Sequence, residues 1–115
     1  MGITRIGTTQ RWSDIVIHNR TVYVVEVAAS ADADLETQAR EVLEQLADSL
    51  ERADSDKTRL LMVTVWLKDI GEIDIFNRHW DAWVPAGCAP VRACVQAALA
   101  KPGYLVEIQA MAAQR

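Results

Sequence analysis

Residues 89–99 of the chain read APVRACVQAAL, and the alternation of side chains along them predicts a β-strand. One face of this strand would carry only small apolar residues, which suits a half-buried surface. The other face would carry Arg92 and Cys94. A guanidinium group at such a position needs an internal partner or a ligand, because taking a charge out of water without one is costly.

The segment that follows predicts a turn and another strand. Residues 100–103 read AKPG, which are turn residues, and residues 104–113 read YLVEIQAMAA and alternate like the strand before them. We expect the two strands to form a hairpin, with Glu107 on the strand beside Arg92. An arginine and a glutamate on neighbouring strands either form a structural ion pair or line one pocket, and the pattern alone favours the ion pair.

The remaining elements are predicted from the same periodicities. SDIVIHNRTVYVVEVA, residues 13–28, predicts a hairpin that reverses at residues 18–20. A helix is expected after an Asp34 cap, because apolar residues recur at helical spacing as far as Leu50. TRLLMVTVWL, residues 58–67, predicts a central strand covered on both faces. GEIDIFNRHWDAWV, residues 71–84, predicts a second helix whose tryptophan-rich stripe packs on the sheet.

These elements follow one another in the order β-β-α-β-α-β-β, with room for a short first strand at residues 3–6. They predict one domain over residues 1–115, an α+β sandwich in which both helices lie on one face of a mixed sheet. No segment is left to cover the other face of that sheet. Oligomerisation is the simplest way to cover it.

Composition excludes several classes of partner. The net charge is −4 and basic residues are scattered, so we expect no nucleic-acid partner. No segment approaches the roughly 20 apolar residues of a membrane span, and the N-terminal residues do not resemble a secretory signal, so we expect a cytoplasmic protein with no membrane partner. Cys88 and Cys94 lack the spacing of a disulfide framework or zinc site, and no histidine has a partner cluster. We therefore expect no metal and no catalytic histidine.

Together, these segments resemble the Rid family of reactive intermediate deaminases, also called the RidA, YjgF or RutC-like family. The nearest likeness is to a small bacterial subgroup with RWSD near the start and WDAWV and APVR near the end. The resemblance covers nearly the whole chain, and it rests on RWSDIVIHN (11–19), TQAREVLEQL (37–46), VTVWLKDIGEIDIFNRHWDAW (63–83), APVR (89–92) and YLVEIQA (104–110).

The resemblance implies a chorismate-mutase-like fold that assembles as a homotrimer, with sheets facing inward and active-site clefts between subunits. By position, it implies that Arg92 binds the carboxylate of the substrate, assisted by the backbone around Cys94. It implies that Glu107 positions or activates the attacking water, and it gives Asn77, at the family's helix asparagine, a contributing role. It implies no cofactor.

The chain departs from better-known family members at two places in the implied site. Trp12 stands where they have a tyrosine, so that it can close a pocket but offers no hydroxyl group. Val25 and Glu26 stand where they have a Ser-Gly pair, so that a hydroxyl group is lost and a carboxylate is gained. We expect all three residues to contact substrate, with a changed substrate choice or a weakened activity.

The activity that the resemblance implies is hydrolysis of reactive enamine and imine intermediates of the 2-aminoacrylate type to 2-oxo acids and ammonia. This would make the protein a deaminase of the 2-iminobutanoate/2-iminopropanoate type. The alternative is a trimer of the same fold that binds small carboxylates or another partner without catalysis. A ribonuclease or translation inhibitor is disfavoured by the negative charge and by the lack of a basic, aromatic strip.

Overall fold

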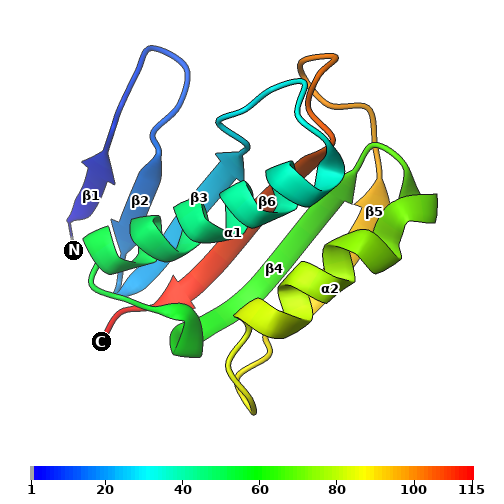
Figure 1. Ribbon diagram of the computed structural model, residues 1–115. Coiled ribbons are helices and arrows are strands. Elements are labelled where there is room, and N and C mark those ends of the chain that lie inside the picture. Colours follow the sequence, from blue (N-terminus) through cyan, green and yellow to red (C-terminus); the bar gives the residue numbers. More distant parts are fainter. Residues whose placement is uncertain (1) are drawn as a thin grey trace.

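The computed structural model describes residues 2–115 as a six-stranded mixed sheet with two helices packed on one of its faces (Figure 1). The predicted α+β class and the order of elements are confirmed, including the short first strand. The elements are β1 (Ile3–Ile6), β2 (Ile15–His18), β3 (Thr21–Val27), α1 (Leu35–Arg52), β4 (Leu60–Leu67), α2 (Ile73–Trp83), β5 (Val91–Gln96) and β6 (Val106–Ala113), with 3-10 turns η1 (Lys57–Arg59) and η2 (Ile70–Glu72).

The turn between β2 and β3 lies where the sequence predicts it. Asn19 and Arg20 both adopt the left-handed backbone conformation, with φ of 51° and 63°. Two consecutive residues of this kind give the turn a twist that matches the twist of the paired strands. Asparagine tolerates the conformation better than most side chains, which explains its place at the first of the two positions.

Helix α1 begins at its predicted cap. The Asp34 side chain accepts a hydrogen bond of 2.9 Å from the backbone N–H of Thr37. That bond stabilises the charged carboxylate and lowers the pKa of Asp34. The apolar face of the helix packs on the sheet, and its fully buried members include Ala39, Val42, Leu46 and Leu50.

The predicted hairpin between the last two strands is wrong. The sheet order is β1-β2-β3-β6-β4-β5, so β4 lies between β5 and β6. β4 pairs with β5 in parallel and with β6 in antiparallel orientation. The strand–helix–strand unit β4-α2-β5 explains this order, because a helical crossover returns the chain to a parallel neighbour of its first strand. The turn residues after β5 belong to a connection that passes β4.

The two faces of the sheet differ in exposure. The helix-covered face supplies the core, with residues of β4 such as Val63, Val65 and Leu67 fully buried. The opposite face, called here the open face, is uncovered, and apolar side chains on it are 40–66 % exposed: Tyr23, Val25, Met62, Val91 and Val95. In one chain, β4 is therefore covered on one face only, contrary to the sequence prediction. An exposed apolar surface of this kind is typical of an interface.

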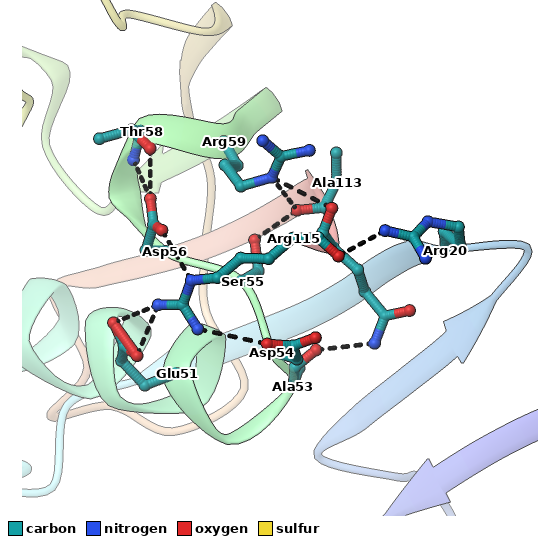
Figure 2. Close-up of polar contacts among 11 residues, drawn as sticks. Arg20, Glu51, Ala53, Asp54, Ser55, Asp56, Thr58, Arg59, Ala113 and Arg115 are labelled. Atoms are coloured by element: carbon teal, nitrogen blue, oxygen red, sulfur yellow. Dashed lines mark hydrogen bonds and ion pairs between the residues drawn. The ribbon is translucent and has the colours of Figure 1, made fainter.

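The end of β6 is attached to the end of α1 by a cluster of polar contacts (Figure 2). Arg115 forms ion pairs with Glu51 at 2.7 Å, with Asp54 at 3.4 Å and with Asp56 at 3.0 Å. These carboxylates raise the pKa of Arg115, with the hydrogen bond to Glu51 as the main cause. The carbonyl oxygen of Ala113 accepts a hydrogen bond of 2.6 Å from the Ser55 hydroxyl. The cluster thereby ties the C-terminal end of β6 to the end of α1.

Candidate functional site

Arg92 lies on β5 and faces the helix layer, where two groups of α2 hold its guanidinium. One guanidinium nitrogen donates a hydrogen bond of 2.9 Å to the side-chain oxygen of Asn77. The central carbon of the guanidinium lies 5.3 Å from the ring centroid of Trp80, a cation–π distance. The structure brings Arg92 and Asn77 together, as a shared site requires. Since β5 is an edge strand, these groups lie at the margin of the sheet.

Cys94 lies two residues further along β5 and is half-buried on the same face as Arg92. Burial raises the pKa of its thiol, and the nearby charge of Arg92 opposes that effect only in part. The uncharged thiol is therefore favoured near neutral pH. The side chain is suited to shaping the surroundings of Arg92 rather than to nucleophilic attack, which needs the thiolate.

Glu107 lies on β6 and points to the open face, where it lines a cavity of about 190 Å³. In the sheet it is paired with Trp66 on β4 and with Val27 on β3. Besides Glu107, the cavity is lined by Trp66 and by Ala97–Ala100, the first residues of the connection after β5. Glu107 is the one charged residue among the lining residues, so its carboxylate lies beside a hollow that is otherwise lined by uncharged residues.

Within one chain, Arg92 and Glu107 do not meet. Arg92 is opposite Val63 of β4, whereas Glu107 is opposite Trp66 of the same strand, on the other face of the sheet. Three residues along the strand and two strand spacings across the sheet separate their Cα atoms by about 14 Å. No small ligand contacts both groups of a single chain.

The residues at which the chain departs from the Rid pattern lie in three different places. Val25 is on the open face, on the diagonal from Glu107 across the β3–β6 pair. Glu26 faces α1 instead, and its carboxylate accepts hydrogen bonds from Ser49 at 2.6 Å and Gln45 at 3.2 Å. Trp12 is 60 % exposed in the β1–β2 loop. That loop lies at the same end of the strands as the start of β6 (Figure 1). The structure therefore brings Val25 near Glu107 but gives Glu26 a contact between helix and sheet.

Two features of the candidate site were missed from the sequence. Trp66 and the Ala97–Ala100 segment line the Glu107 cavity. They were missed because the sequence predicted that both faces of β4 are covered and that a tight turn connects β5 to β6. Trp80 was predicted only to pack on the sheet, yet it also lies against Arg92. A prediction of β4 and β5 as parallel neighbours would have placed both tryptophans correctly. Within residues 2–115, no three His, Cys, Asp or Glu side chains are grouped as metal ligands.

Comparisons with known proteins agree on the fold and on a family. A sequence model of the family described as "Endoribonuclease L-PSP" matches residues 2–114. The RutC family protein YoaB of Escherichia coli is 46 % identical over 113 residues, which cover 98 % of this chain and 99 % of that protein. A crystal structure of a YjgF family member from Neisseria meningitidis has a TM-score of 0.95 at 38 % identity, covering 100 % of this chain and 97 % of the other.

A more distant relative has a named activity. The 2-iminobutanoate/2-iminopropanoate deaminase of Rattus norvegicus is 29 % identical over 110 residues, which cover 90 % of this chain and 80 % of that enzyme. In addition, no helix within residues 2–115 combines the length and the apolar composition that a membrane span requires.

Proposed function

Because this chain belongs to the YjgF/RidA/RutC family, matched by the Endoribonuclease L-PSP sequence model, we propose that it hydrolyses reactive 2-imino acids to 2-oxo acids and ammonia. The named activity of the rat relative supports the reaction class. The observation that carries the proposal in this chain is the arrangement of Arg92, whose charge is held by an amide oxygen and a ring rather than by a carboxylate.

Arg92 would bind the carboxylate of the substrate. A guanidinium presents several N–H donors in a planar fork, which suits two parallel hydrogen bonds to a carboxylate. One donor is used by Asn77, and no acidic side chain forms an ion pair with Arg92 in the described part of the chain. The cation is therefore oriented before a ligand arrives, which reduces the free-energy cost of fixing it on binding.

Glu107 would act on the water. Its carboxylate accepts a hydrogen bond from a water molecule, orients the water oxygen toward the imine carbon and takes up a proton as the C–O bond forms. The imine nitrogen gains a proton, and the resulting carbinolamine loses ammonia as its hydroxyl proton is removed. One water is consumed, and one 2-oxo acid and one ammonia are released. The imine carbon is already electrophilic, so positioning and proton transfer supply the catalysis.

The site would be completed by a second copy of the chain in a homotrimer. Since Arg92 and Glu107 of one chain lie on opposite faces of the sheet, a substrate that contacts both must lie between subunits. The apolar open face and the free edge of β5 support such an assembly. In a ring of three copies, each chain buries one part of its surface against a different part of the next chain, so that the open face of one copy is covered by its neighbours.

The proposal is tested by generating 2-aminoacrylate or 2-iminobutanoate in situ with an amino acid dehydratase or oxidase and following 2-oxo acid formation. The wild-type protein is expected to accelerate the hydrolysis above the spontaneous rate. Arg92→Ala is expected to lower kcat/KM on the order of 10²-fold, because two charge-assisted hydrogen bonds to the substrate are lost. A wild-type protein that gives no acceleration with either substrate would refute the proposal.

A non-catalytic binding trimer is the second candidate. Val25 favours it, because an apolar side chain occupies the open face near Glu107 at the position of the family's Ser-Gly pair. If the protein binds a stable 2-oxo acid through Arg92 and yet does not accelerate imine hydrolysis, this second function is the correct one. The net charge of −4 argues against RNA as a substrate.

A further inference from the structure

A cavity of about 230 Å³ lies between the two helices, and no part of the proposed reaction uses it. We call it the helix groove and define it by Arg40, Leu43 and Glu44 of α1, Lys57 of η1, and His79 and Trp83 of α2. Arg40 precedes Leu43 by three residues and Glu44 by four, and His79 precedes Trp83 by four, so each helix turns one face toward the groove. The helices lie on the sheet face opposite Glu107, so the groove is separate from the Glu107 cavity (Figure 1).

The floor of the helix groove is apolar. Leu43 is 2 % exposed and belongs to the core. Trp83 is half-buried and packs against the core, with the Nζ atom of Lys57 5.3 Å from its ring centroid. Because Leu43 is already buried, the apolar surface that a small group could cover is mainly that of the half-buried Trp83 ring.

The rim of the groove carries two cations that form no ion pair in the described part of the chain, and the charge of one of them, Arg40, adds to the hydrogen bonds that lower the pKa values of Asp34 and Glu41 nearby. Arg40 and Lys57 form no ion pair with any residue from 2 to 115, in contrast to Arg78 and Arg115, which do. Glu44 is the one acidic residue of the lining, so Arg40 and Lys57 leave the groove with an excess of positive charge in a chain whose net charge is −4. Such a local excess attracts anions.

A polar bridge joins the two helices beside the groove. Glu36 of α1 accepts a hydrogen bond from Arg78 at 2.6 Å and contacts the Nε2 atom of His79 at 3.1 Å. The second contact orients the His79 ring, which lines the groove.

We propose that the helix groove binds a small organic carboxylate, whose carboxylate group is held by Arg40 and Lys57 and whose apolar part rests on Trp83. The geometry carries this assignment through three features together: the exposed part of an aromatic ring, two cations at the rim that form no ion pair within residues 2–115, and a His79 ring oriented by Glu36. Neither Arg92 nor Glu107 lines this site, and its link to the proposed reaction site is the packing of Trp83 on Trp80, the ring beside Arg92.

Phenylacetate is the probe for this site, and phenylacetamide is its uncharged counterpart. The indole N–H signal of Trp83, identified with Trp83→Phe, is followed by NMR during titration of the wild type and of Arg92→Ala. We expect a saturable shift with phenylacetate in both proteins and a much weaker one with phenylacetamide. Persistence in Arg92→Ala separates the groove from the proposed catalytic cleft.

Charge variants provide the second test. Arg40→Gln and Lys57→Gln are each expected to raise the Kd for phenylacetate on the order of tenfold. Arg52→Gln is the matched control, because Arg52 is exposed on the same helix and does not line the groove, and it should leave the Kd unchanged. Equal weakening by all three variants, an equal response to phenylacetamide, tighter binding of zwitterionic phenylalanine than of phenylacetate, or no saturable shift would overturn the proposal.

Discussion

Arg92 differs from Arg78 and Arg115 in the kind of group that holds it. Arg78 and Arg115 are matched to carboxylates, which use up their charge in local ion pairs. The partners of Arg92 are a neutral amide and an aromatic ring, which orient the guanidinium without neutralising it. A substrate carboxylate would then be the first negatively charged group to pair with Arg92.

Asn77 is expected to act as a positioning residue for Arg92. Asn77→Ala removes the acceptor, so the guanidinium gains rotational freedom and KM for the imino acid should rise about three- to tenfold, with a smaller change in kcat. Asn77→Asp should raise KM further, because it supplies a competing carboxylate. Steady-state kinetics of both variants check this, and an Asn77→Asp variant with wild-type KM would contradict it.

Glu107→Gln is expected to lower kcat more than it changes KM. Glutamine keeps the size of the side chain and one acceptor oxygen but does not take up a proton, so a general-base contribution of about 10²–10⁴-fold should be lost. Glu26→Gln is the control, because the Glu26 carboxylate is engaged by Ser49 and Gln45 and should affect stability rather than kcat. A rise in KM alone would give Glu107 a role in binding only.

For helices and strands, the sequence predicts which residues form each element and which of its faces is buried. It does not predict which strand lies beside which. Alternation assigns Val106, Ile108 and Ala110 to the buried face, and helical spacing assigns the core face of α1, as the structure has them. The pairing of β5 with β4 is not encoded in the pattern of β5 itself, because an alternating strand fits beside any other. For this reason the sequence wrongly predicted β5 and β6, and with them Arg92 and Glu107, as neighbours. The crossover through α2 places β5 beside β4 instead.

Gln38 shows how one helix residue fixes a loop that lines the Glu107 cavity. Its side chain is fully buried, donates to the carbonyl oxygens of Gly103 at 2.8 Å and Ala33 at 3.0 Å, and accepts from the N–H of Leu105 at 2.9 Å. The connection from Ala97 onward is thereby tied to α1. The sequence predicted Gln38 only as part of a family-like helix.

Gln38→Met is expected to lower the free energy of unfolding by about 2–4 kcal/mol, because buried backbone groups of the connection lose their partners. Gln45→Met on the same helix is the control and should cost less, since Gln45 is only half-buried and its partners are nearer to solvent. Denaturant unfolding measures both. Equal effects of the two variants would remove the special role of Gln38.

For the molecule as a whole, the open face predicts self-association. We expect sedimentation to give a trimer at micromolar concentration. Arg92→Ala and Glu107→Gln chains, each strongly impaired alone, should recover about a quarter of the wild-type activity when unfolded and refolded together in equal amounts. Random mixing restores that share of intersubunit sites, because each site then needs one intact residue from each of two chains. A stable monomer, or no recovery on mixing, would contradict a site between subunits.

The pH dependence of stability follows from carboxyl groups whose pKa values are lowered by folding. The pKa of Asp34 is lowered by the backbone N–H of Thr37, that of Glu36 by hydrogen bonds from Arg78 and His79, and that of Asp56 by the Thr58 hydroxyl. A carboxyl group with a lower pKa in the folded chain contributes stability above its unfolded pKa and loses it as the pH falls through the folded value.

Thermal unfolding is therefore expected to change little from pH 7 to about pH 5 and to shift to lower temperature as the pH falls toward about 3. Asp34→Asn keeps an acceptor oxygen for Thr37 but does not titrate, so its Tm should decline less steeply over that interval. A decline identical to that of the wild type would show that the cap carboxylate does not contribute. Added salt should weaken the part that comes from the exposed Glu36.

The central place of β6 in the sheet has a consequence for how the chain is made. β1, β2, β3 and α1 form one half of the sheet, β4, α2 and β5 form the other, and β6 is the strand that pairs with both. On a ribosome, residues 106–113 are the last of these elements to leave the exit tunnel, so the two halves emerge with facing strand edges unpaired. Unpaired edges of this kind are prone to wrong associations, and contacts between distant segments form slowly. Productive folding of this domain is thus deferred until β6 has been made, and a nascent chain that stalls before Val106 would be a substrate for chaperones or proteases.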